Sequence, residues 1–370
     1  MEKKLMEEII HQPSFYPQKT RKSEKERRSD LLAWNEKYNE VNEYYNVWGG
    51  DLEGANLEDF LDHGIFRKQR YSINSEFVCS GDMFPTNYTV VMRDKSLFEM
   101  WAAHILGDSK KIVTSYAMIK GFEYQSREGD YEERKQDTLE KFFIRHDGEK
   151  IVFKRTTGCS GKAVYIGLLK GGKLIHGGSE YTSKEFFNKI SDKAAAWMLQ
   201  PFVKQHEFMA GLNPDTVNIV RIVTFHTGKR TFYVPPMLVY SRGDTEVCNS
   251  DQGSYYVGMS KEGVIEEKAI DQKNCRMIPC SVAGMTLPYF RELVDLVLTL
   301  HKAIPELFTV GWDVALTEDG PLVFEGNDGW CPYVSQWSQE TALRPIWNEA
   351  VAERKEYYEE VAKQKRRKYL

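Results

Sequence analysis

The sequence predicts a chain of mixed helices and strands, built around two strand–turn–strand segments that carry polar residues. Apolar runs flank an Asp-Gly turn between residues 311 and 327, which is typical of a β-hairpin. Strand-like runs also flank a loop with two glycines between residues 150 and 166. From about residue 88, strand and helix patterns alternate. A chain of 370 residues can bury a sizeable core and hold two or three subdomains.

The hairpin between residues 311 and 327 carries three oxygen ligands. Strand geometry places residues i and i+2 on one face, so Glu325 and Asn327 point together. If the turn spans Glu318–Gly320, Asp313 lies opposite Glu325. Two carboxylates and an amide carbonyl suit Mg²⁺ that carries nucleotide phosphates. An ordinary acidic surface hairpin remains an open alternative.

The loop between residues 150 and 166 has the composition of a phosphate-binding turn. Gly158 and Gly161 allow backbone N–H groups to approach phosphates, and Lys154 and Lys162 supply positive charge. It is not a Walker A loop, because only two residues separate the glycines and Ala163 replaces the required Ser or Thr. An ordinary hairpin turn is the alternative.

Taken together in this order, the segments resemble the ATP-grasp superfamily, whose members hold ATP between two α+β subdomains. Met92–Phe98 resembles the segment that opens a helix and reaches the phosphates through Lys95. Val152–Lys154 resembles the strand of the second ATP-binding lysine, and Leu199–Val203 resembles the hinge that reads adenine through its backbone. The resemblance implies nucleotide contacts from Lys95, Lys154, Gly158, Ser160, Gly161, Lys162, Gln200, Phe202 and Val203.

The segment Asn213–Thr224 resembles the strand whose arginine faces the transferred phosphate or acyl group, which implies a catalytic role for Arg221 beside Lys154. The metal ligands implied are Asp313, Glu325 and Asn327. Among subfamilies, the chain is most similar to the sugar-transfer-associated ATP-grasp proteins. Ser250–Gly258 is bulkier than the glycine-rich stretch expected there. The residues that could line the acceptor pocket are Asp328, Trp330 and Tyr333, although Trp330 could equally fill the core.

The resemblance implies an α+β ATP-grasp fold with four parts. We expect an N-terminal helical extension (1–87), a first subdomain with the phosphate loop (88–200), a second with the Mg²⁺ site (201–338) and a C-terminal helix (339–370). Patterns within them predict the following elements: helices at 31–41, 56–61, 96–106, 123–149, 290–301 and 340–369, and strands at 88–92, 112–119 and 232–240. His301 ends an apolar helical stripe, so we expect a packing role for it.

Composition excludes several classes of function. A net charge of −4 argues against nonspecific nucleic-acid binding. The six cysteines are scattered without a zinc-like spacing, and no apolar stretch approaches the roughly 20 residues that span a bilayer. We therefore expect a cytoplasmic protein with reduced thiols. The basic segments 19–28 and 363–368 read as solvated or dipole-complementing helix ends, with binding of an anionic partner as the alternative.

The implied activity is an ATP- and Mg²⁺-dependent carboxylate–amine ligase that forms an acyl-phosphate. Its substrates would be small molecules: an amino acid, peptide or sugar acid, and an amine. A role in polysaccharide biosynthesis, and association with enzymes of that pathway, follow from the subfamily alone. Two alternatives remain. One is a small-molecule kinase of the same fold, and the other is a nucleotide-dependent subunit that docks on a glycosyltransferase through the basic ends.

Overall fold

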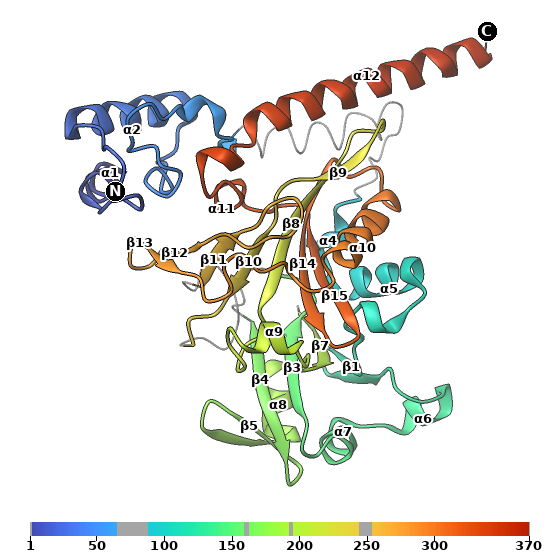
Figure 1. Ribbon diagram of the computed structural model, residues 1–370. Helices are drawn as coiled ribbons and strands as arrows, with labels where there is room; N and C mark the ends of the chain where they lie inside the picture. The colour runs from blue at the N-terminus through green and yellow to red at the C-terminus, as the bar shows by residue number, and fades with distance from the viewer. Residues whose placement is uncertain (1, 65–87, 159–162, 192–194, 244–253, 370) are drawn as a thin grey trace.

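A computed structural model describes residues 2–64, 88–158, 163–191, 195–243 and 254–369 (Figure 1). Its centre consists of two antiparallel sheets that follow one another along the chain. The first sheet has seven strands in the order β2-β1-β7-β3-β4-β5-β6. These are β1 (Ala117–Lys120), β2 (Glu123–Ser126), β3 (Lys150–Arg155), β4 (Val164–Lys170), β5 (Lys173–His176), β6 (Ser179–Thr182) and β7 (Ala196–Pro201).

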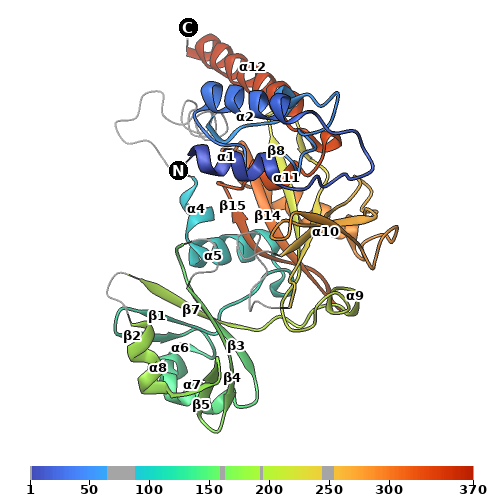
Figure 2. The same ribbon diagram turned by 90° about the vertical axis from the view of Figure 1, so that its left-hand side faces the viewer.

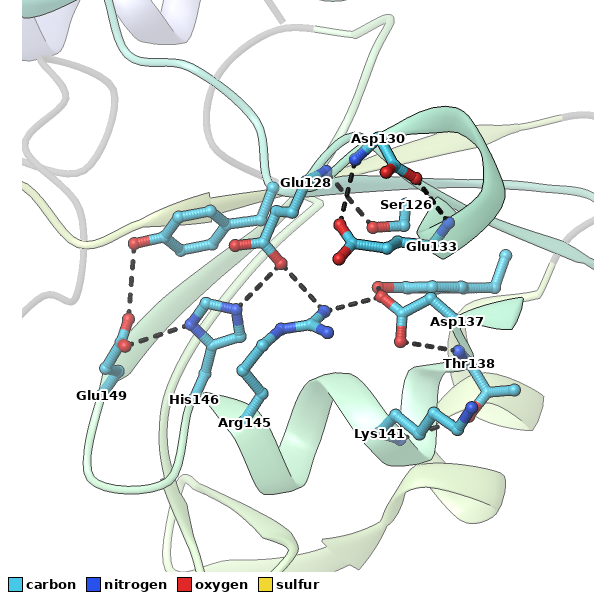
Figure 3. Close-up of polar contacts among 12 residues, drawn as sticks. Ser126, Glu128, Asp130, Glu133, Asp137, Thr138, Lys141, Arg145, His146 and Glu149 are labelled. Atoms are coloured by element: carbon cyan, nitrogen blue, oxygen red, sulfur yellow. Dashed lines mark hydrogen bonds and ion pairs between the residues drawn. The ribbon is translucent and has the colours of Figure 1, made fainter. Parts of the chain in front are cut away.

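Helices α7 (Leu139–Arg145) and α8 (Ser183–Ile190) pack on the first sheet, and their phenylalanines Phe142, Phe143 and Phe186 are buried. A polar network joins α7 to β2 and its following turn (Figure 3). Arg145 bridges Glu128 and Asp137 at 2.9 and 2.6 Å, and His146 lies 3.1 Å from carboxylate oxygens of Glu128 and Glu149. The network fixes the helix against the sheet.

The second sheet has eight strands, seven in the order β13-β12-β11-β10-β8-β14-β15, with β9 paired to β8. These are β8 (Ile219–His226), β9 (Thr231–Tyr233), β10 (Met237–Tyr240), β11 (Tyr255–Gly258), β12 (Lys268–Asp271), β13 (Arg276–Pro279), β14 (Thr309–Thr317) and β15 (Gly320–Asn327). Helices α5 (Lys95–Leu106) and α10 (Phe290–Lys302) contribute Phe98 and Leu293 to its core. The expected division of the chain at residues 88 and 200 stays a prediction. It assigns α5 to the first subdomain, whereas α5 packs on the second sheet.

The remaining helices lie mostly at the two ends of the chain. They are α1 (Glu2–His11), α2 (Glu24–Tyr38), η1 (Leu57–Asp59), α4 (Val90–Arg93), η2 (Ser109–Lys111), α6 (Tyr131–Gln136), α9 (Glu207–Ala210), α11 (Pro332–Ser335), η4 (Gln339–Thr341) and α12 (Arg344–Tyr369). In both views α2 lies near α11, and α12 extends away from the sheets (Figures 1 and 2). None of the described helices is both long and apolar enough to cross a membrane.

Four expected elements differ from the structure. The run expected as one strand at 232–240 forms two strands, β9 and β10, on either side of residues 234–236. Residues 88–92, expected as a strand, enter helix α4, since Met92 packs into the core behind β15 and Asp94 caps the next helix. The expected helix at 123–149 is a strand and two short helices, because Asp130 caps a new helix after Gly129, whose φ is +71°. The strand expected at 112–119 begins only at Ala117.

Candidate active site

The hairpin β14–β15 places Asp313 opposite Glu325, as predicted, but through a different turn. Thr317 pairs with Gly320, so the turn is one residue shorter than the expected Glu318–Gly320. A bulge beside Phe324 shifts the register by one residue and restores the Asp313–Glu325 pair. Because side chains alternate along a strand, the bulge brings the acidic residues to one face.

Two cations compensate the carboxylates of the hairpin. Arg221 on β8 lies opposite Asp313 in the sheet and binds it with Nε and Nη2, the latter at 2.9 Å from Oδ2. Lys95 at the start of α5 places its Nζ 3.2 Å from Glu325 Oε2. Asn327 Nδ2 donates to Asp313 Oδ2 at 3.4 Å and to Glu325 Oε1 at 3.5 Å. The predicted metal ligands therefore converge.

The pKa values of the two carboxyl groups are shifted apart. Burial and the adjacent Glu325 raise the pKa of Asp313 despite its contact with Arg221. Burial also opposes ionisation of Glu325, but Lys95 and Lys154 outweigh it and lower the pKa of this carboxyl. Glu325 is therefore held as a carboxylate, which is the form that binds a cation.

The two predicted lysines approach Glu325 from different elements. Asp94 caps α5 with its carboxylate and sets Lys95 at the first helical position, one residue before the expected start of this helix. Lys95 Nζ also donates to the Gly158 carbonyl at 3.1 Å, which links the helix to the loop after β3. Burial lowers the pKa of Lys154 on β3 to about 8, although Glu325 partly offsets this effect. The charged form of Lys154 is poorly solvated, so an anion that binds beside it stabilises the ammonium group.

The predicted hinge lies at the end of β7. Gln200 is buried and donates to Glu99 Oε2 at 3.3 Å and to the Val113 carbonyl at 3.1 Å. The Phe202 ring lies 3.8 Å from Lys150 Nζ. Val203 belongs to an apolar cluster that combines residues of β14 and β15 with residues that flank strands β1, β7 and β8. Its members are Val113, Val203, Val217, Ala315, Leu322 and Phe324. Lys154 Nζ lies 5.9 Å from the Phe324 ring, so this cluster borders the charged site.

The chain matches the model of the sugar-transfer-associated ATP-grasp family over residues 81–351. The match includes the hairpin, both lysines and Arg221. The chain belongs to this ATP-grasp family. No curated protein matches it.

Several solved ATP-grasp enzymes are similar in structure at low sequence identity. The ADP complex of purK, an N5-carboxyaminoimidazole ribonucleotide synthetase, has 12% identity, a TM-score of 0.38, and coverage of 65% of this chain and 45% of its own. D-alanine-D-alanine ligase from Coxiella burnetii has 10% identity and a TM-score of 0.38, and the match covers 75% of this chain and 61% of the ligase. VanG D-Ala:D-Ser ligase from Enterococcus faecalis has 9% identity and a TM-score of 0.43, and the match covers 73% of this chain and 62% of the ligase. The chain therefore spans less than two thirds of the length of each of these three enzymes.

Other predicted residues of this ATP-grasp site have different outcomes. Ser160, Gly161 and Lys162 lie outside the described residues, whereas Gly158 has a φ of +112° and open space around its Cα. Asp328 forms an ion pair with Arg93 at 2.8 Å. Trp330 is 2% exposed and fills the core, which is one of its two expected roles. Tyr333, expected to line the acceptor pocket, is also 2% exposed and packs in the interior.

His301 has the expected packing role. Its Nδ1 lies 2.6 Å from Thr224 Oγ1 and its Nε2 lies 3.0 Å from the Leu307 carbonyl. Burial lowers its pKa to about 3, so the ring is neutral.

Glu99 is a buried residue that the sequence interpretation missed. Its carboxylate accepts from Ser115 N at 2.9 Å, Arg127 Nη1 at 2.7 Å and Gln200 Nε2. It lies one turn after Lys95, and its charge opposes the loss of the Lys154 proton. A glutamate among Phe98, Met100 and Trp101 in a helix was the available signal.

The donor set fits a hard divalent cation. Asp313 and Glu325 present carboxylate oxygens from facing strands, and rotation of the Asn327 amide would add its carbonyl oxygen. No described group of three or more His, Cys, Asp or Glu offers a rival site. Lys95 and Arg221 form ion pairs with the two carboxylates. This supports the fit, because two adjacent carboxylates repel each other unless positive charge lies beside them.

Proposed function

We propose that the protein is an ATP-dependent carboxylate–amine ligase that works through an acyl-phosphate. The observation that carries the proposal is the convergence of Lys95, Lys154 and Arg221 on the Asp313–Glu325 pair. These residues come from α5, β3, β8 and the β14–β15 hairpin. Family membership supports the same assignment. Five charged groups at the junction of two sheets are well suited to stabilise a highly charged phosphoryl group in transfer.

In this proposal ATP lies between two subdomains, 88–200 and 201–338. Lys95 and Lys154 bind its phosphates, together with the loop that begins at Gly158 and includes Ser160, Gly161 and Lys162. The adenine occupies the apolar cluster around Val203, with the backbone from Gln200 to Val203 as its polar contact. This arrangement places the base in apolar surroundings and the phosphates among cations.

Asp313, Glu325 and Asn327 would hold Mg²⁺, which supplies neutralisation of phosphate charge when it is bound. Lys95 and Arg221 compensate these carboxylates in the structure and would turn to substrate oxygens instead. Arg221 is the residue proposed to contact the transferred phosphoryl or acyl group.

The reaction has two steps. A carboxylate oxygen of the substrate attacks the γ-phosphorus, and ADP leaves with the electrons of the broken P–O bond. The amine then attacks the acyl carbon, and inorganic phosphate leaves. Lys154 and Arg221 stabilise charge on the oxygens in transfer, while the enclosing sheets exclude water from the acyl-phosphate. We also propose that the protein acts in polysaccharide biosynthesis, associates with enzymes of that pathway and is located in the cytoplasm.

Substitution of Glu325 tests the proposal. The E325Q variant should bind Mg-ATP at least tenfold more weakly and lose ADP formation in a pool of carboxylic acids and amines, because the amide removes one anionic ligand. D319N is the matched control, since Asp319 is an exposed acid on the turn of the same hairpin. Unchanged ATP affinity and turnover in E325Q would contradict the assignment.

A further inference from the structure

A second polar cluster follows the catalytic hairpin. Cys331 lies four residues after Asn327, at the position that precedes α11. Its Sγ lies 3.5 Å from Nε2 of His63, a residue 268 positions earlier in the chain. This distance is within the range of a hydrogen bond to sulfur. The N-terminal extension therefore supplies an imidazole to a thiol beside the proposed active site.

The imidazole of His63 is held by its neighbours. It stacks on the Tyr333 ring with centroids 4.0 Å apart and an interplanar angle of 10°. Its backbone N–H donates to Glu40 Oε1 at 3.2 Å, and its Nδ1 lies 4.0 Å from Glu40 Oε2. The Tyr333 hydroxyl also donates to Glu40. The order is thus thiol, imidazole and carboxylate, with the first two at hydrogen-bond distance and the last two at ion-pair distance. A nucleophile, its base and a third group beside the base follow one another in this order.

The cluster lies close to the proposed site of acyl transfer. Arg221 pairs with Met237 in the second sheet, so the two side chains lie on one face of it. Cys331 packs against the apolar cluster on that face, which includes Met237. The thiol therefore lies on the same face of the sheet as the arginine that we assign to the transferred group. It is also partly exposed, as a thiol that meets a substrate must be.

The other described cysteines have different surroundings. Cys275 donates to the Gln272 carbonyl at 3.7 Å, and Cys280 is buried. Burial raises the pKa of both thiols, which disfavours the reactive thiolate. These surroundings are those of structural cysteines, and they provide an internal comparison for Cys331.

We propose that Cys331 receives the acyl group from the acyl-phosphate and holds it as a thioester before the final acceptor attacks. This inference rests on the proposed function. His63 Nε2 takes the thiol proton, and Sγ forms a bond to the acyl carbon. The bond from that carbon to the phosphate oxygen breaks, and inorganic phosphate leaves with the electron pair. The acceptor amine then forms a C–N bond, the C–S bond breaks, and the thiol regains a proton.

Alkylation of the full-length protein by iodoacetamide tests the thiol without any substrate. Peptide mass mapping should show Cys331 reacting at least tenfold faster than Cys275, and H63Q should lower the Cys331 rate at least tenfold while leaving the Cys275 rate unchanged. Equal rates for Cys331 in the parent protein and H63Q would overturn the proposal. This result would not affect the ligase assignment.

A second experiment tests the acyl group itself. The protein is incubated with Mg-ATP and a pool of amino acids and sugar acids. The reaction is quenched in acid, and the mass of the intact protein is measured by mass spectrometry. We expect an adduct on Cys331 that hydroxylamine releases, absent from C331S and present in C275S. If C331S forms amide product at the parent rate, the thioester is overturned and the ligase stands. If hydroxylamine traps no hydroxamate and no ADP forms with either protein, the proposed function fails as well.

Discussion

At the scale of single residues, the site is a balance of charges. Asp313 and Glu325 face Arg221, Lys95 and Lys154. The pKa of Lys154, about 8, lies below its ordinary value of 10.5, because burial disfavours its charged form. The triphosphate of ATP would reverse this effect, since an adjacent anion favours the ammonium. ATP binding and protonation of Lys154 should therefore be linked.

We predict that binding of Mg-ATP at pH 8.5 takes up most of one proton and that uptake falls toward pH 7, where Lys154 is already charged. Calorimetric titration in buffers of different ionisation enthalpy measures this number directly. K154M should abolish the uptake, whereas K170M, at an exposed position on β4, should retain it. Equal uptake by the parent protein and K154M would contradict the assignment of Lys154.

Much of the residue-level site could be predicted from the sequence because its signals are local. Asp94 and Lys95 are adjacent, and Glu325 and Asn327 are two residues apart on one strand. The partnership of Arg221 with Asp313 depends on strand order, which has no local signal. The same holds for His63 and Cys331, whose contact depends on the packing of the chain's N-terminal part against α11.

At the scale of elements, strand β15 shows why a correct pair can follow from an incorrect turn. The sequence predicted a longer turn and an uninterrupted ladder, whereas the hairpin has a shorter turn and a bulge. The two differences cancel at Asp313 and Glu325. A bulge depends on cross-strand packing, so single-strand periodicity could not reveal it. Gly326 lies between the two ligand positions and meets α4 on its other side.

Gly326→Ala should therefore disturb the site through the face of β15 that packs on α4. An added Cβ would lie 2.6 Å from Met92 Sδ and 3.0 Å from Trp312 Cζ3. We expect a loss of about 1–3 kcal/mol in the free energy of unfolding and weaker ATP binding, because overpacking displaces α4 and the adjoining Lys95. Denaturant unfolding and calorimetry measure the two effects. G211A, where contacts begin at 3.4 Å, is the control, and equal behaviour of both variants would contradict this prediction.

Across the molecule as a whole, the C-terminal helix α12 is anchored to the second sheet and to the segment before β14. Arg354 on α12 is 1% exposed and donates to three backbone carbonyls, those of His226, Pro305 and Glu306, at 2.6 to 3.1 Å. These carbonyls lie at the end of β8 and before β14. The C-terminal helix was predicted from its composition and length, but its buried arginine was not, since the basic residues of the helix suggested a solvated surface.

R354M should lower the free energy of unfolding by roughly 3 kcal/mol, because it leaves buried carbonyls without donors. Chemical denaturation followed by tryptophan fluorescence measures the change. K355M, at the next and exposed position of α12, should change stability by less than about 0.5 kcal/mol. Similar losses in the two variants would show that Arg354 does not anchor the helix.

The two-sheet architecture followed from the ordered set of segments, and the family match confirms the ATP-grasp fold. The elements between residues 88 and 149 could not be predicted correctly from the sequence. Charged residues there form two short capped helices and an edge strand, and such short elements have no periodic pattern of apolar residues that would distinguish them. The packing of α5 on the second sheet depends on tertiary contacts of Phe98 and Ala102.

The proposed activity joins a carboxylate to an amine and cleaves ATP to ADP and phosphate in doing so. To test this activity, the purified protein is incubated with Mg-ATP, pooled amino acids, sugar acids and amino sugars, and ADP, free phosphate and new masses are measured together. We expect equal amounts of ADP and phosphate and a product whose mass is the sum of two substrates minus water. A product heavier by one phosphoryl group, without free phosphate, would contradict the ligase and identify a kinase.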